Sequence, residues 1–205
     1  MNHIAPRTFA LLLALAALAG CGIVPKKSEI TLYSPRISAV PDPAWPRAGA
    51  QLVVMRPSAD RLTDSNRIVV RPTPGEAQVY RGASWVQPAP DMLQDAVIHL
   101  LEDSGKLNGV ARRGGGIAGD FNLALDIRRF DADYAGGDKP TAVVEVSASL
   151  IRNDRNQVAG HRVFRASTPA AGVEVADVSR AFEQALSQVA KEVSGWSLRA
   201  MDEAR

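Results

Sequence analysis

Alternating apolar and polar positions mark two long stretches of this chain. Between residues 121 and 128 every second side chain is apolar, and the same period of two recurs between residues 144 and 150. A period of two places the apolar side chains on one face of a strand, so both stretches are predicted strands with one buried face. Phe130 falls out of phase with the first stretch, which predicts a β-bulge near Arg129.

Turn-forming residues separate these stretches from a third. Gly136, Gly137 and Asp138 come between the two strands, and a polar cluster at 153–156 follows the second. We expect residues 161–166 to return as a third strand, which makes an antiparallel meander. Three shorter strands are expected earlier in the chain, with Gly75 in a hairpin turn between the second and the third; their ranges are 51–55, 67–71 and 76–85.

Helical spacing predicts two helices. The first covers residues 88–102, with Pro90 in its first turn, Asp91 near the positive end of its dipole and Gly105 as its stop. The second follows Asp177, which we expect to be its N-cap. Its apolar stripe spans about five turns and consists of Val178, Phe182, Ala185, Val189, Val193 and Trp196. The predicted fold is therefore α+β, an antiparallel sheet with two helices on one face in a two-layer sandwich.

The first 21 residues have the layout of a bacterial lipoprotein signal. Arg7 precedes an uncharged apolar run at 8–19, and Leu18-Ala19-Gly20-Cys21 places small residues directly before a cysteine. The run is shorter than the roughly 20 apolar residues that span a bilayer. We therefore expect cleavage of residues 1–20 and acylation of Cys21, which becomes the first residue of the mature protein. An ordinary signal with a chance cysteine is the alternative.

Proline and cysteine usage divide the rest of the chain. Residues 21–49 carry five prolines and one β-prone island at 30–33, and we expect an acylated tether with a short strand. A single α+β domain is expected at 50–205. Because Cys21 is the only cysteine, that domain has no disulfide, and its core must stabilise it alone.

Charge and motifs favour binding over catalysis. The formal net charge is only +2, which gives no basic field for nucleic acid. His99 and His161 lack the spacing of metal ligands, and the glycine-rich stretch 114–120 lacks the Lys-Ser/Thr of a phosphate loop. Asp126, Asp131 and Asp133 are the carboxylates that tertiary structure could bring together. We expect no enzyme, no metal and no cofactor apart from the acyl chains on Cys21.

Short motifs in a fixed order resemble the ABC-type transport auxiliary lipoprotein family. The most specific block is Tyr80-Arg81-Gly82-Ala83-Ser84-Trp85, which continues through Pro88 and Pro90. The other matching segments are residues 30–34, 61–62, 68–71, 93–94, 126–130, 150–151 and 182–186. The resemblance covers most of the mature chain.

The resemblance implies a role in lipid transport. Members of this family face the periplasm and act with an ABC permease, an ATPase and a lipid-binding MCE-domain protein. It implies that this chain docks the MCE protein from the outer membrane, and Gly22 after Cys21 is compatible with export to that membrane in enteric-type sorting. The family has no established catalytic residues that could be assigned to this chain. Whether the protein forms a homo-oligomer stays open.

Tyr80, Arg81 and Trp85 are the candidate partner-binding residues, because tyrosine, tryptophan and arginine are enriched at interface hot spots. The alternative for Trp85 is a core position against the helix that starts at residue 88. Two other functions stay open, a direct lipid carrier with a pocket between sheet and helices, and an envelope structural lipoprotein unrelated to transport.

Overall fold

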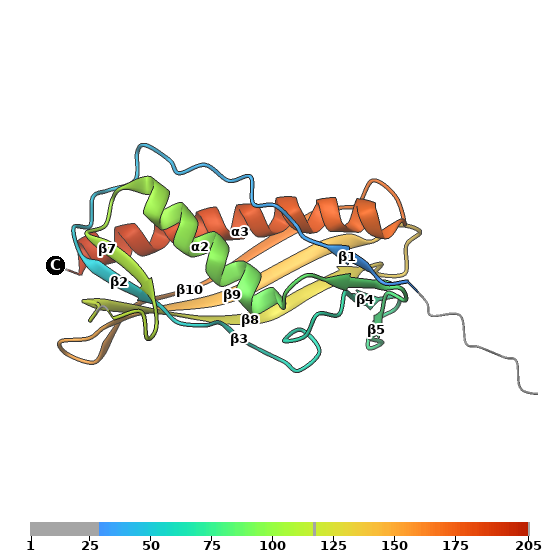
Figure 1. Cartoon of the computed structure of the whole chain (residues 1–205), viewed down its shortest axis with the longest axis horizontal. Helices are drawn as coiled ribbons and strands as arrows, with labels where there is room; N and C mark the ends of the chain where they lie inside the picture. The colour runs from blue at the N-terminus through green and yellow to red at the C-terminus, as the bar shows by residue number, and fades with distance from the viewer. Residues whose placement is uncertain (1–28, 117, 205) are drawn as a thin grey trace, which may run out of the picture.

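A long twisted sheet forms one layer of the fold, and two helices lie together on one of its faces (Figure 1). The computed structural model describes residues 29–116 and 118–204. The predicted α+β class is confirmed, as is the placement of the helices in a single second layer. The predicted signal peptide, Cys21 and the first part of the predicted tether lie outside the described residues.

The three longest strands form the predicted meander. They are β8 (Phe121–Asp133), β9 (Thr141–Arg152) and β10 (Gln157–Pro169), and both pairings are antiparallel. The register between β8 and β9 shifts between Ile127 and Arg129, so the predicted bulge is confirmed. The extra residue turns Phe130 back to the buried face, where it is 3% exposed.

The other half of the sheet is mostly parallel, so the prediction of an antiparallel sheet is wrong for this half. β2 (Gln51–Val54) runs parallel to both β8 and β7 (Gly109–Arg112), and β3 (Ser58–Ala59) and β4 (Val69–Arg71) pair in parallel with β8 further along. The strand order is β10-β9-β8-β2-β7. β8 is long enough for β2, β3 and β4 to pair with it one after another, along the edge that β9 does not occupy.

The single strand predicted at 76–85 is wrong, because the chain forms two strands there. β5 (Gln78–Val79) makes the predicted hairpin with β4 around Gly75, whose φ is +83°. Gly82, with φ +66°, then redirects the chain. β6 (Ala83–Trp85) leaves the sheet and pairs in parallel with β1 (Thr31–Tyr33). We call this two-stranded β1–β6 unit the ribbon.

The first helix, α2 (Ala89–Ser104), begins one residue later and ends two residues later than the predicted range of 88–102, and its predicted stop at Gly105 is confirmed. Pro90 lies in its first turn, and Gly105 adopts the left-handed conformation at φ +62° that ends it. Its apolar face is buried, and the side chain of Gln94 donates a hydrogen bond of 3.1 Å to the carbonyl oxygen of Val54 in β2. This bond pairs a buried polar side chain and fixes α2 over the parallel half of the sheet.

The second helix, α3 (Val175–Glu203), lies over β9 and β10 (Figure 1). The predicted stripe from Val178 to Val193 is buried, whereas Trp196 is half-buried. The prediction of Asp177 as N-cap is wrong, because the helix begins at Val175 and Glu174 is the cap residue. Asp177 lies in the first turn instead, where it pairs with Arg180 and still faces the positive end of the dipole.

The described part of the predicted tether lies on the domain. The backbone N–H of Arg36 donates to Glu183 Oε2 at 3.2 Å, and that of Ser38 donates to Ser187 Oγ at 3.0 Å. Trp45 is 6% exposed and belongs to the core. Residues 34–48, which we call the strap, therefore follow the helices as part of the packed unit. The prolines favour an extended backbone in the strap, and this extended segment still packs on the domain.

Candidate functional site

Trp85 lies in the core. It is 1% exposed, and its indole makes edge-to-face contacts with Phe182 and Phe130 at centroid distances of 5.3 and 6.1 Å. Of the two positions weighed for Trp85, the structure shows the core position. Its role is to fix β6 to Phe130 of β8 and Phe182 of α3 rather than to offer a surface.

Tyr80 and Arg81 line an open groove. The groove has a volume of about 530 Å³ and lies between the β4–β5 hairpin and the chain that follows β8, with Tyr134 and Gly137 on its far side. Arg81 is exposed, and Tyr80 is partly buried. Two tyrosines and an arginine thus converge in one concave surface. Sequence reasoning missed Tyr134, because no motif connects it with Tyr80.

The hydroxyl group of Tyr80 is buried without a hydrogen-bond partner in good geometry among the described residues. Burial raises the pKa of this phenol well above its ordinary value, and the neighbouring Tyr134 raises it further. The group therefore stays protonated at neutral pH and remains a donor.

The carboxylates near the groove are held by arginines. Arg129 Nη2 lies 2.6 Å from Asp131 Oδ1 and 2.7 Å from Asp133 Oδ2, and Arg71 Nε lies 3.0 Å from Asp131 Oδ2. The hydrogen bond from Arg129 holds the pKa of Asp133 below its ordinary value. Asp126 lies apart from them and accepts a 2.6 Å bond from Ser58 Oγ. The three aspartates thus stabilise strand positions and do not form an acid–base pair.

The two histidines are placed separately. His99 is exposed on α2, whereas His161 Nδ1 lies 3.1 Å from Ser149 Oγ, directly across the β9–β10 ladder. A serine nucleophile also needs a group that orients the base. Among residues 29–116 and 118–204, no carboxylate hydrogen-bonds to His161, and no cluster of three or more metal-ligating side chains occurs.

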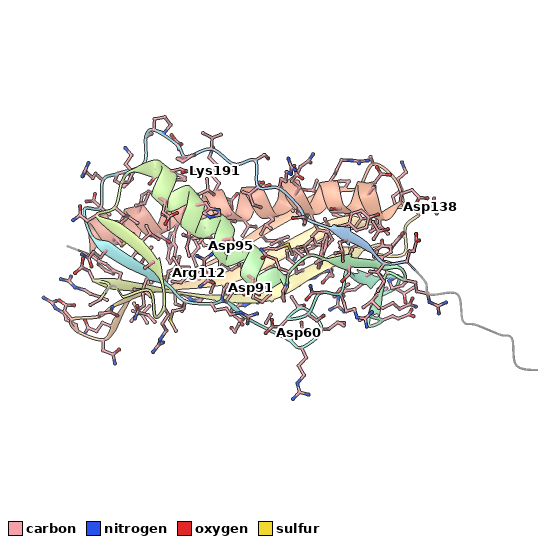
Figure 2. All side chains as sticks on the ribbon, in the orientation of Figure 1. Asp60, Asp91, Asp95, Arg112, Asp138 and Lys191 are labelled. Atoms are coloured by element: carbon pink, nitrogen blue, oxygen red, sulfur yellow. The ribbon has the colours of Figure 1, made fainter. Side chains whose placement is uncertain are left out.

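Ion pairs attach α2 to the layer beneath it. Arg112 of β7 pairs with Asp95, and Figure 2 shows these two side chains close together beside α2. Arg56 bridges Asp64 at 2.6 Å and Asp91 at 2.8 Å. These hydrogen bonds, that to Asp64 above all, raise the pKa of Arg56 beyond its already high ordinary value. This side of the molecule is a solvated, charge-paired surface.

The groove lies near one end of the molecule. Asp138, in the turn after β8, marks this end in Figure 2, and β1, β4 and β5 lie toward it in Figure 1. The C-terminal end of α3 lies at the opposite end (Figure 1). In the described part of the chain, no helix combines the length and the apolar character needed to cross a bilayer.

Comparison with known proteins identifies the family. The sequence profile of the ABC-type transport auxiliary lipoprotein component matches residues 31–194, which includes the ribbon, the strap, the groove and most of α3. The chain belongs to this family. The match begins at β1, in agreement with the packing of the strap on the domain.

Several other proteins are similar to this chain. The crystal structure of protein XCC0632 from Xanthomonas campestris is 49% identical, covers 83% of this lipoprotein chain and 95% of its own, and superposes with a TM-score of 0.80. Uncharacterized protein bll6063 of Bradyrhizobium diazoefficiens is 26% identical over 93% of this chain, which spans only about 50% of bll6063. The hypothetical protein CT253 from Chlamydia trachomatis, with 10% identity and a TM-score of 0.51 over 74% of this chain and 97% of its own, shares the fold alone.

Proposed function

We propose that this auxiliary lipoprotein is an outer-membrane-anchored, periplasm-facing component of an MCE-type ABC lipid-transport system, in which it docks the MCE protein. The observation that carries the proposal is the family match over residues 31–194, which includes almost all of the described fold. A transport auxiliary component acts by binding, and the described side chains offer a binding groove with paired carboxylates beside it rather than an acid–base set.

The proposed anchor is the acylated Cys21. Only eight residue steps separate Cys21 from Glu29, the first described residue, and an extended chain spans at most about 3.6 Å per residue. Glu29, where the described domain begins, is then held within about 30 Å of the bilayer. An anchor this short keeps the lipoprotein at the membrane surface and limits the reach over which it can meet a partner.

The proposed docking site is the groove of Tyr80, Arg81 and Tyr134. Tyrosine and arginine are the residue types that most often dominate binding energies, and a concave site lets them be desolvated on docking. Trp85 contributes indirectly, because its packing holds the strand that follows Arg81 and Gly82.

Capture of the MCE protein tests this docking role. The full lipidated chain, tagged and solubilised in detergent, should bind the MCE-domain protein of the same organism. Tyr80→Ala and Arg81→Ala should each weaken binding by about 30-fold, which corresponds to about 2 kcal/mol. Arg155→Ala is the matched control, since Arg155 is 66% exposed and lies in the β9–β10 turn. Failure of the wild-type protein to bind, or wild-type affinity in both groove variants, would contradict the proposal.

The anchor has its own test. Cells expressing the wild-type chain and fed a labelled fatty acid should yield labelled protein in the outer-membrane fraction. Cys21→Ala should carry no label and should keep its signal, because acylation of the thiol precedes cleavage by lipoprotein signal peptidase. Wild-type protein without label would rule out the lipoprotein anchor, and label confined to the inner membrane would rule out the outer-membrane placement.

A further inference from the structure

Three aliphatic side chains project into solvent from the ribbon. Ile30 is 61% exposed, Leu32 63% and Val86 52%. Alternation along β1 puts Ile30 and Leu32 on the face opposite to Tyr33, which packs on the core. Leu32 lies beside Ser84 in the register, and Val86 follows two residues later. We call these three residues the ribbon patch.

The backbone holds the ribbon patch rigidly. The N–H of Thr31 donates to the carbonyl oxygen of Gly82 at 2.8 Å, and the N–H of Val86 donates to that of Tyr33 at 2.9 Å. Beneath the ribbon, Trp85 is fixed among aromatic rings. Single exposed aliphatic residues are ordinary on protein surfaces, but here backbone hydrogen bonds hold the strands that carry three of them in fixed positions.

The ribbon patch is next to the point where the anchor joins the domain. Ile30 follows the first described residue directly, so the chain from Cys21 holds the patch within about 30 Å of the bilayer. The 29-residue helix α3 is longer than that, at about 43 Å, and its C-terminal end lies at the other end of the molecule (Figure 1). Of the two ends, the one with the ribbon is tied to the membrane.

Basic residues adjoin the patch, together with one exposed carboxylate, that of Glu29. Arg81 is exposed, and it precedes Gly82, at which an added Cβ would lie 3.6 Å from the carbonyl oxygen of Glu29. In the sequence, Lys26 and Lys27 lie between Cys21 and the patch. Basic side chains close to anionic headgroups favour binding to the bilayer, and basic residues beside apolar ones are typical of interfacial segments.

We infer that the ribbon patch rests on the bilayer, with Ile30, Leu32 and Val86 among the lipid headgroups. The inference depends on the proposed acyl anchor and adds an orientation to it. The ribbon end faces the membrane, and the C-terminal end of α3 points away from it. The groove of Tyr80 and Tyr134 then opens next to the headgroups, so a partner bound in the groove meets the membrane surface.

Site-specific fluorescence tests this orientation. Because Cys21 is the only cysteine and is consumed by acylation, one introduced cysteine gives a unique label. Leu32→Cys and Val86→Cys report on the ribbon patch. Val158→Cys is the matched control, since Val158 is also 63% exposed and lies at the start of β10, at the other end of the long strands. Each full-length lipidated variant carries an environment-sensitive dye in vesicles of phosphatidylethanolamine and phosphatidylglycerol.

Brominated lipids in these vesicles should quench the dye at positions 32 and 86 at least twofold and leave the dye at 158 unquenched. Equal quenching at 32 and 158, whether absent or strong, would overturn the inference. Protection of position 32 by added MCE protein or by a second copy of the chain, without quenching by lipid, would overturn it in favour of a protein contact.

A second variant distinguishes the contribution of the ribbon patch to membrane contact from that of the acyl anchor. Leu32→Ser should reduce quenching at position 86 while acylation of Cys21, read by mass spectrometry, stays complete. Unchanged quenching at 86 would contradict a role for the patch. Capture of the MCE protein in detergent does not involve the bilayer, so it distinguishes failure of this inference from failure of the docking proposal. An unacylated wild-type preparation would remove the anchor and the inference together.

Discussion

The indole of Trp45 lies directly against Gly195, in the body of α3. A Cβ atom at position 195 would be 2.6 Å from Trp45 Nε1 and 2.9 Å from Cε2. Glycine inside a helix is less favourable than alanine by about 1 kcal/mol, and here its lack of a side chain is what lets the strap close on the helix. The contact joins two segments that are 150 residues apart in the chain.

Gly195→Ala should therefore destabilise the domain despite the higher helix propensity of alanine. The added methyl group displaces the indole, and overpacking of this kind costs about 1–3 kcal/mol. Urea unfolding measures the loss. In the Trp45→Ala background the same substitution should be neutral or stabilising, because the clash is gone. Equal destabilisation in both backgrounds would show that the indole is not the obstacle.

Trp85→Ala should lower the free energy of unfolding by about 3–5 kcal/mol, because it leaves a cavity beside the stacked rings of Phe130 and Phe182. Thermal and urea unfolding report the change. Arg81→Ala, at an exposed position four residues earlier, should leave stability within about 0.5 kcal/mol of wild type. A Trp85→Ala protein with wild-type stability would mean that the side chain is not packed in the core.

Val189→Asp should prevent stable folding. Val189 is 0% exposed in the stripe of α3, and a lone charge placed there costs several kcal/mol, a large part of a total stability of about 5–15 kcal/mol. Circular dichroism and melting measure the outcome. Gln188→Asp places the same charge one residue earlier at an exposed position and should melt close to wild type. Similar melting of the two variants would contradict the packing of α3 on the sheet.

Acid should weaken the network of Arg129, Asp131 and Asp133. The pKa of Asp133 is below its ordinary value of 3.8 in the folded chain, so the folded state binds fewer protons than the unfolded state in this range. Its stabilisation is therefore fully present above the ordinary value and is lost as pH falls through the lowered pKa.

Asp133→Asn should accordingly cost about 1 kcal/mol at pH 7, a modest figure because the two side chains are 24% and 26% exposed. The difference from wild type should shrink as pH falls below 3.8. Melting temperatures measured between pH 7 and pH 2.5 check this, with Asp138→Asn in the exposed turn as the charge control. A difference that does not change with pH would contradict the role of the ion pair.

The periodic spacing of apolar residues predicted the strands and the helix that have one buried face and one face toward solvent. The alternation of β8 and β9, the bulge before Phe130 and the stripe of α3 follow from side chains that face either the core or water. The stop of α2 at Gly105 follows from local backbone chemistry. The resemblance in the block around residues 80–85 pointed to the family, which the match over residues 31–194 shows.

The parallel half of the sheet follows no local pattern. β7 contains only one strongly apolar residue, Val110, and it becomes a strand because β2 offers it a partner. The break at Gly82 and the docking of Trp45 likewise depend on residues more than 45 positions away. Of the candidate site, Tyr80 and Arg81 could be named from residue type alone. Tyr134 required tertiary structure, because a turn brings it to the groove.

The parallel pairings also have a consequence for export. β1 pairs with residues 83–85, and β2 pairs with residues 109–112 and 121–123. In a chain that enters a secretory channel amino terminus first, these early strands cross long before their partners. Non-local pairing of this kind delays folding, and the core closes only when α3 has also emerged. In such a chain the leading third, which holds β1 and β2, cannot complete its share of the sheet until residues 83–123 are available to pair with it.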